Sequence, residues 1–170
     1  MSSLRVKTIN GEFATGEYAE YLDQDIAAWG EVWNFPLNKS IPVPDHYPAL
    51  GACADFLKKN KGLYCRLMGL ASRSGTDRFN YAISDKRCRN VHGYLVVHGD
   101  VAPEQLTHSS GSYFIALGEE AWKILGVADG KVSEKERHRA VVMTVWKHNK
   151  PSMLQQMKVL KRIIQWDARY

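Results

Sequence analysis

Residues 63–95 read LYCRLMGLASRSGTDRFNYAISDKRCRNVHGYL, and they contain the strongest indication of the fold in this sequence. Its first eight residues alternate between two faces, as those of a strand do, and Leu63, Cys65 and Leu67 share one face. A loop rich in glycine, serine and aspartate follows, in which Gly75 allows a tight turn. The first half of the stretch therefore predicts a strand over 63–70 and then a loop.

The second half of the stretch predicts a helix that begins at Ser84 and ends at Gly99. Ser84 stands where an N-cap residue belongs, and Asp85 adds a negative charge that the helix dipole favours in the first turn. The apolar residues then recur at helical spacing. They are Cys88, Val91 and Leu95. Together with Cys53, Leu57, Cys65 and Leu67, they are expected to form one core between two helices and a sheet.

The elements outside this stretch predict the fold class. A helix is expected from Pro48 to Asn60, strands over 31–37, 105–108 and 140–146, and a short helix over 119–125. The order is then β-α-β-α-β with an extra short strand and helix before the last strand. It indicates an α+β two-layer sandwich with the helices packed on one face of a small mixed sheet.

The two ends of the chain lie outside this pattern, so three units are expected. Residues 1–30 form an N-terminal extension with a short strand over 4–9 and a helix over 17–29. Residues 31–148 form the main domain. Residues 149–170 form a basic amphipathic helix whose apolar stripe consists of Met153, Met157, Leu160 and Ile164. This stripe is expected to pack on the domain; a partner protein and an anionic membrane surface are the alternatives.

The positive charge of the chain is concentrated at its C-terminus. Residues 147–170 carry six cationic side chains and one anionic side chain, a balance of +5 that equals the net charge of the whole chain. Residues 1–146 are therefore neutral. A nucleic-acid-binding domain would need a basic patch with aromatic platforms on its own surface, so no nucleic-acid partner is expected.

The cysteines and histidines do not predict a metal site or a disulfide framework. The three cysteines have no CxxC spacing, and the six histidines are scattered without the spacing of metal ligands. We expect buried free thiols and no cofactor. The sequence has no nucleophile motif, no phosphate-binding glycine loop and no paired groups for acid–base work, so it is not expected to be an enzyme.

The sequence leaves the compartment open. No run of about eighteen apolar residues could span a bilayer, and residues 1–7 lack the apolar core of a signal peptide. The chain is then expected to be cytoplasmic, or periplasmic or particle-associated by a leaderless route, unless a leader is missing from this sequence.

Two segments resemble the OmpA-like family. Residues 34–40, NFPLNKS, are similar to the family's opening strand and its F-x-x-x-K-S turn before the first helix. Residues 69–95 align without a gap on the family pattern G-x-T-D-x-x-G-(x)4-N-x-x-L-S-x-x-R-A-x-x-V-x-x-Y-L. The resemblance covers roughly residues 31–146. It implies a non-enzymatic module that binds the peptide stem of bacterial peptidoglycan.

The resemblance also implies which residues bind the ligand. In peptidoglycan-binding members an aspartate grips the ammonium of diaminopimelate, and an arginine grips its carboxylate. The arginine matches Arg87, whereas Ser72 stands at the aspartate position. The expected position of Arg87 in the first turn of a helix would make it a carboxylate receptor, although a surface ion pair with Asp77 or Asp85 is the alternative. Binding is therefore expected to be weak or altered.

The remaining candidate residues would support that pair. Asn80 and Gly75 would shape the loop, Arg139 would support the site from the last strand, and Asp77 is the nearest substitute for the missing acid. The alternative function is a protein–protein module that keeps the fold without binding peptidoglycan. It would be a structural component of a bacterial or phage-like secretion or injection assembly.

Overall fold

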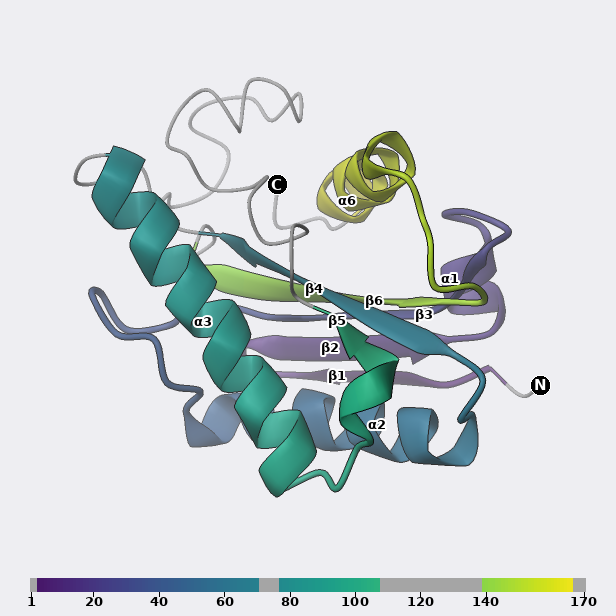
Figure 1. The fold of residues 1–170 in the computed structure, drawn as a ribbon, viewed down its shortest axis with the longest axis horizontal. Coiled ribbons are helices and arrows are strands. Elements are labelled where there is room, and N and C mark those ends of the chain that lie inside the picture. The colour runs from purple at the N-terminus through teal and green to yellow at the C-terminus, as the bar shows by residue number, and fades with distance from the viewer. Residues whose placement is uncertain (1–2, 71–76, 108–138, 167–170) are drawn as a thin grey trace.

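Within the described residues, a mixed six-stranded sheet with the strand order β1-β2-β3-β6-β4-β5 forms the centre of the structure (Figure 1). The computed structural model describes residues 3–70, 77–107 and 139–166. The strands are β1 (Arg5–Thr8), β2 (Gly11–Thr15), β3 (Ile26–Val32), β4 (Tyr64–Leu70), β5 (Leu106–Thr107) and β6 (Ala140–Trp146). β4 and β5 pair in parallel, and every other pair is antiparallel. The predicted strands at 63–70 and 140–146 are confirmed.

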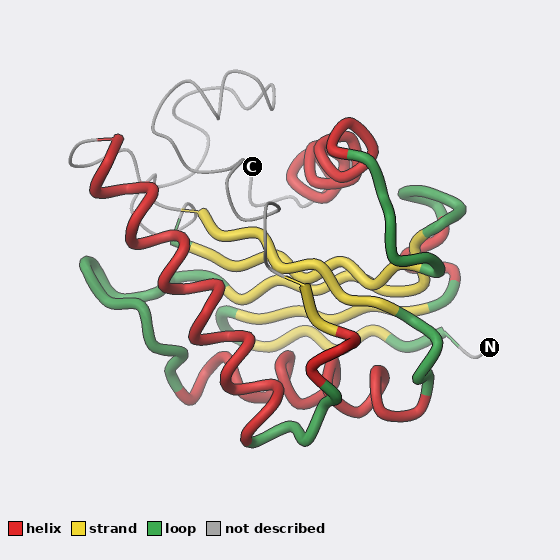
Figure 2. The backbone as a smooth tube through the Cα atoms, in the orientation of Figure 1, coloured by secondary structure: helices red, strands yellow, loops and turns green. Residues whose placement is uncertain are grey.

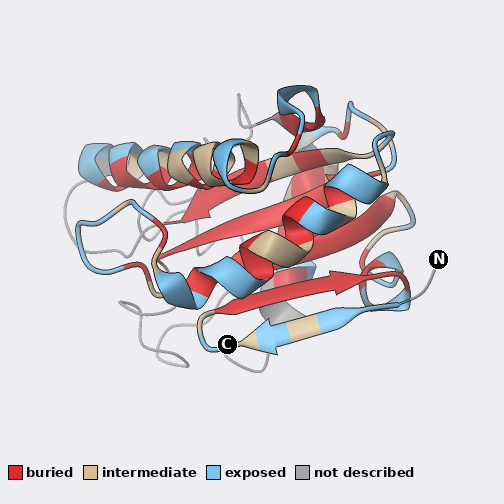
Figure 3. Ribbon diagram, turned by 90° about the horizontal axis from the view of Figure 1, so that it is seen from below, coloured by how far each residue is buried: buried red, intermediate tan, exposed pale blue. Residues whose placement is uncertain are grey.

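Helices cover both faces of this sheet (Figures 1 and 2). The helices are α1 (Glu17–Glu20), α2 (Tyr47–Lys59), α3 (Asp77–Val97) and α6 (Met153–Trp166), with short 3₁₀ turns at Pro44–His46 and Pro103–Gln105. α2 and α3 pack on one face, as predicted (Figure 3). α1 and α6 lie against the other face, so the expected two layers gain a third.

The core under α2 and α3 matches the sequence-based prediction. The seven residues expected to form it are all fully buried in a single cluster with side chains from β3 and β6. They are Cys53, Leu57, Cys65, Leu67, Cys88, Val91 and Leu95. The periodicity of each stripe predicted the buried face correctly because the apolar side of each helix packs on the sheet.

The start of α3 corrects the prediction of a helix beginning at Ser84. The helix begins seven residues earlier, at Asp77. The Ser84 hydroxyl does not cap a helix; it donates a hydrogen bond to the carbonyl oxygen of Tyr81 at 2.8 Å, inside the helix. A serine hydroxyl can form a hydrogen bond both at a helix N-cap and inside a helix. The presence of a serine therefore does not show where a helix begins.

The N-terminal region also differs from its prediction. The helix expected over 17–29 is only the four residues of α1, and the strand expected over 31–37 is β3, which ends at Val32. Hydrogen bonding to β2 and β6 on both sides places β3 inside the sheet, which overrides the helical spacing of its apolar residues. Asn34, with a φ of 60°, turns the chain away after the strand. The expected boundary at residue 31 therefore lies within β3, and the helix expected over 119–125 lies outside the described residues.

α6 forms as predicted and packs on the domain. Val159, Leu160 and Ile163 are fully buried, and they belong to the cluster that contains Trp29 and Trp146. Leu160 and the half-buried Met157 belong to the predicted stripe. The side chains of Met153 and Ile164 lie outside the described residues.

Gly93 provides a first test of the packing of α3. A Cβ atom at this position, in the interior of the helix, would meet no atom within 4 Å. Alanine should therefore fit without strain and lower the conformational entropy of the unfolded chain. We expect Gly93→Ala to raise the free energy of unfolding by about 0.5–1 kcal/mol, measured by urea denaturation. A loss of stability would show that the space above Gly93 is filled.

Candidate functional site

The candidate site lies where β3, β4 and β6 meet at one end of the sheet. Leu70, the last residue of β4, pairs with Ala140, the first residue of β6. The chain that leaves β3 stays close to this point, because the Phe35 amide donates a hydrogen bond to the Arg139 carbonyl oxygen at 3.1 Å. Three backbone segments thus converge beside the helix α3.

Arg87 reaches this point from α3 and is only 1% exposed. Its Nε donates to the Lys39 carbonyl oxygen at 2.9 Å, and its Nη1 donates to the Leu70 carbonyl oxygen at 3.2 Å. The guanidinium carbon lies 5.3 Å from the centre of the Phe35 ring, at the distance of a cation–π contact. Burial, with the nearby charge of Arg139, lowers the pKa of Arg87 to about 10.

Arg139 approaches the same point from the start of β6 and is also buried. Its Nε donates to the Phe35 carbonyl oxygen, and its Nη2 donates to Oδ1 of Asn34 at 3.1 Å. The two arginines thus hold residues 34–39 against the end of the sheet. We call these two side chains, with the segment that they hold, the arginine clasp.

Gly69 explains how α3 comes close enough to place Arg87 in the clasp. A Cβ atom at residue 69 would overlap the Ser84 carbonyl oxygen and lie 2.8 Å from the Ser84 carbonyl carbon. The backbone of α3 therefore crosses β4 directly over this glycine. Arg87 lies one turn beyond Ser84, which brings its guanidinium to the end of β4.

The described contacts of Arg87 use only part of its hydrogen-bonding capacity. A guanidinium has five N–H groups, and only two of those on Arg87 donate to described residues, both to carbonyl oxygens. A carbonyl oxygen accepts a hydrogen bond but does not neutralise the charge. Within the described part of the chain, Arg87 has no acidic partner, so a carboxylate would complement it.

The structure brings together only some of the predicted site residues. Arg87 and Arg139 meet in the clasp, but Arg87 lies well inside α3 and not in its first turn, so the expected contact with a helix N-terminus is wrong. Asn80 is a buried residue of α3 and not part of a loop; its Nδ2 has no partner among the described atoms.

Three further candidates lie wholly or in part outside the described residues. Ser72 and Gly75 lie outside the described residues. Asp77 opens α3, where a loop residue was expected, and its side chain lies outside them too. Sequence reasoning missed Asn34 as a partner of Arg139, although it belongs to the quoted NFPLNKS segment. Backbone acceptors such as the Lys39 carbonyl leave no signal in the sequence.

Other kinds of site find no support among the described residues. No group of three or more histidine, cysteine, aspartate or glutamate residues could hold a metal ion there. None of the helices traced in this part of the chain combines the length and apolar character that a membrane crossing requires.

Neither a protein-family model nor a curated protein matches the sequence. Solved structures do match. The peptidoglycan-associated lipoprotein of Burkholderia pseudomallei is 20% identical, covering 68% of this chain and 88% of its own, with a TM-score of 0.54. The OmpA-like domain of FopA1 from Francisella tularensis is 13% identical over 88% and 83%, with a TM-score of 0.53. The periplasmic domain of Helicobacter pylori MotB is 13% identical over 93% and 91%, with a TM-score of 0.54. The chain has the OmpA-like fold that the sequence resemblance predicted.

Proposed function

We propose that this chain is a non-enzymatic module that associates with peptidoglycan and binds a carboxylate of its stem peptide at the arginine clasp. The observation that supports this most is the burial of Arg87 without an acidic partner among the described residues. A buried charge normally has a counter-ion, because removing it from water is costly. A ligand carboxylate would supply that counter-ion, and a similar fold occurs in a protein described as peptidoglycan-associated. The proposal implies that the chain reaches the periplasm.

The clasp would hold only half of a zwitterionic ligand. Ser72 stands where the sequence pattern has an aspartate for the ammonium of diaminopimelate. A serine hydroxyl accepts a hydrogen bond but carries no charge. Loss of one partner from a desolvated charge pair costs about 2–5 kcal/mol. We therefore propose that the wild-type chain binds diaminopimelate-type stem peptides weakly.

Restoring the acid tests this proposal. Ser72→Asp should tighten binding of a diaminopimelate-containing stem tetrapeptide at least about tenfold, the low end of what a desolvated charge pair contributes. Calorimetric titration of the wild type, Ser72→Asp, Arg87→Lys and the double variant gives the coupling between the two positions. Arg87→Lys keeps a charge but loses the planar fork, so it should cancel the gain.

The same titrations include a control for folding. Arg87→Lys must first show the cooperative urea unfolding of the wild type, because the clasp also holds residues 34–39. Lys86→Ala, on the exposed side of α3, removes one charge next to Arg87 and should leave binding unchanged. Tight binding by the wild type that ignores position 87 would place the ligand elsewhere and contradict the proposal.

The rival function is a protein–protein component of a secretion or injection assembly. One observation favours it: both arginines already donate to the chain's own backbone, so the clasp is a structural tie even without a ligand. Under this hypothesis, Ser72→Asp does not create binding, and the chain does not sediment with purified sacculi. That pair of results would replace the leading proposal.

A further inference from the structure

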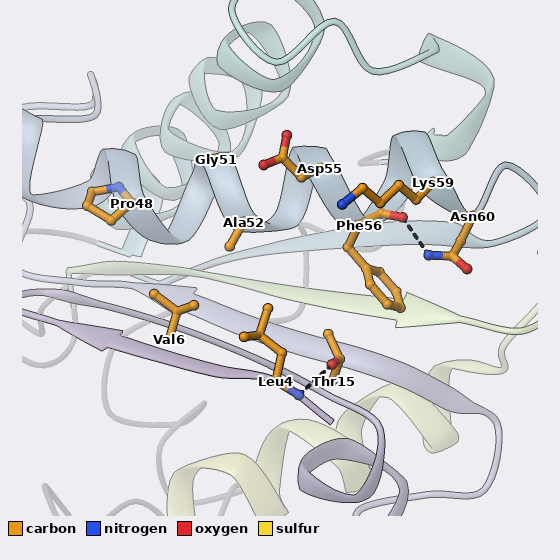
Figure 4. Close-up of a pocket in the computed structure, with 10 residues that line it drawn as sticks. All are labelled: Leu4, Val6, Thr15, Pro48, Gly51, Ala52, Asp55, Phe56, Lys59 and Asn60. Atoms are coloured by element: carbon orange, nitrogen blue, oxygen red, sulfur yellow. Dashed lines mark hydrogen bonds between the residues drawn. The ribbon is translucent and has the colours of Figure 1, made fainter. Parts of the chain in front are cut away.

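A groove of about 600 Å³ runs between α2 and β1, at the edge of the sheet farthest from β4 (Figure 4). Its walls are largely apolar. Leu4 and Val6 line it from the strand side, and Ala52 and Phe56 line it from α2. Leu4 is half-exposed although it is apolar. Three strands separate β1 from β4, so this groove is distinct from the arginine clasp.

The outer edge of β1 forms the open side of this groove. β1 is the last strand at its end of the described sheet. The Thr15 amide donates to the Leu4 carbonyl oxygen at 2.8 Å, so Leu4 faces β2 with its backbone. Antiparallel strands alternate the direction of these groups. The N–H and C=O groups of Arg5 and Lys7 therefore point outward, away from β2.

We propose that this edge and groove bind an extended acidic segment of a partner protein, which adds to the sheet as a strand beside β1. An exposed strand edge next to a helix is the arrangement used for strand addition: the edge supplies main-chain hydrogen bonds and the groove takes alternate side chains. Here every second side chain of the segment would be apolar and enter the groove beside Val6 and Phe56.

The charges on β1 select the partner. Arg5 and Lys7 are exposed on the face of β1 opposite Val6, so the intervening side chains of an added strand would lie against them. The buried Glu12 pairs with Arg5 at 2.7 Å, whereas the described contacts of Lys7 include no ion pair. Lys59 adds a further cation to the groove, and Asp55 one anion. Acidic residues at alternate positions complement this edge.

A second copy of the chain complements it less well. If two β1 strands pair antiparallel with their Val6 residues opposite each other, Arg5 of each strand lies opposite Lys7 of the other. Like charges directly opposite each other destabilise a strand pair. The occupant is therefore a different, acidic sequence.

Gly51 offers a way to close the groove without disturbing the fold. It lies within α2 on the groove wall, and a Cβ atom there would meet no atom within 4 Å. A leucine at this position should favour the helix and fill the space in front of it. Lys7→Pro removes the outward N–H of β1 while leaving the bonds to β2 intact, as proline on an edge strand does.

The probe is a synthetic decapeptide of alternating glutamate and valine, compared with one of alternating lysine and valine. The glutamate peptide should bind at least tenfold more tightly in a fluorescence titration. It should also slow hydrogen exchange at the Arg5 and Lys7 amides. Gly51→Leu and Lys7→Pro should each weaken binding at least tenfold, and Lys7→Ala, which loses only the charge, should weaken it less.

Lys86→Ala serves as the control for a lost surface charge and should bind like the wild type. Equal binding of the two peptides, or unchanged exchange at the Arg5 and Lys7 amides, would overturn the proposal. A wild-type dimer in analytical ultracentrifugation that Lys7→Pro converts to a monomer would also overturn it, since the occupant would then be a second copy.

Discussion

A chain that ends at Asn149 should lose at least about 4 kcal/mol of its free energy of unfolding. Such a chain lacks α6, three of whose aliphatic side chains are fully buried: Val159, Leu160 and Ile163. Burial of each aliphatic side chain contributes about 1.5–3 kcal/mol. The truncation also exposes the face of the sheet that carries Trp29 and Trp146. Residues 1–149 alone should therefore be much less stable than the whole chain.

Point variants separate the packing of α6 from its charge. Leu160→Ala should cost about 3 kcal/mol, within the range for a fully buried leucine. Lys158→Ala, on the exposed side of the same helix, should change stability by less than about 0.5 kcal/mol. Urea denaturation followed by tryptophan fluorescence measures both. If the truncated chain unfolds at the wild-type urea concentration, α6 contributes nothing to the core, and its role must lie in binding a partner.

Local periodicity correctly predicted those elements whose conformation depends on their own residues alone. The alternation over 63–70 and the stripe of α2 each place a buried face without reference to distant residues. Periodicity gave the wrong prediction for β3. Hydrogen bonding to β2 and β6, rather than the spacing of the apolar residues, makes this segment a strand. The prediction of where α3 begins was wrong because serine is found both at helix N-caps and, as here, inside a helix.

The candidate site was predictable in its charges but not in its contacts. The family pattern singled out Arg87, and Arg139 was expected to support it from the last strand. The structure places the two side chains close together. Their acceptors are carbonyl oxygens of Phe35, Lys39 and Leu70, which every residue type possesses. No pattern of side chains can therefore predict these acceptors. The sequence also does not distinguish a buried arginine from an exposed one.

Replacing Gly69 with valine should abolish cooperative folding or cost well over about 3 kcal/mol, above the usual range for an overpacked core. The reason is that the new Cβ would collide with the backbone of α3 at Ser84, and not with a side chain that can rotate away. α3 would have to move off β4. The hydrogen bond from Arg87 to the Leu70 carbonyl oxygen spans that contact, so the arginine clasp should open with it.

Gly69→Ala tests the same contact with a smaller change, and Gly93→Ala is its matched control. Both add one methyl group to the chain, but the Gly93 methyl enters open space. Urea denaturation should show a loss of about 2–3 kcal/mol for Gly69→Ala, against a small gain for Gly93→Ala. Equal stability of the two variants would mean that α3 does not cross β4 at Gly69. Arg87 would then not be held at the end of β4 by this contact, and the carboxylate site built on it would lose its structural basis.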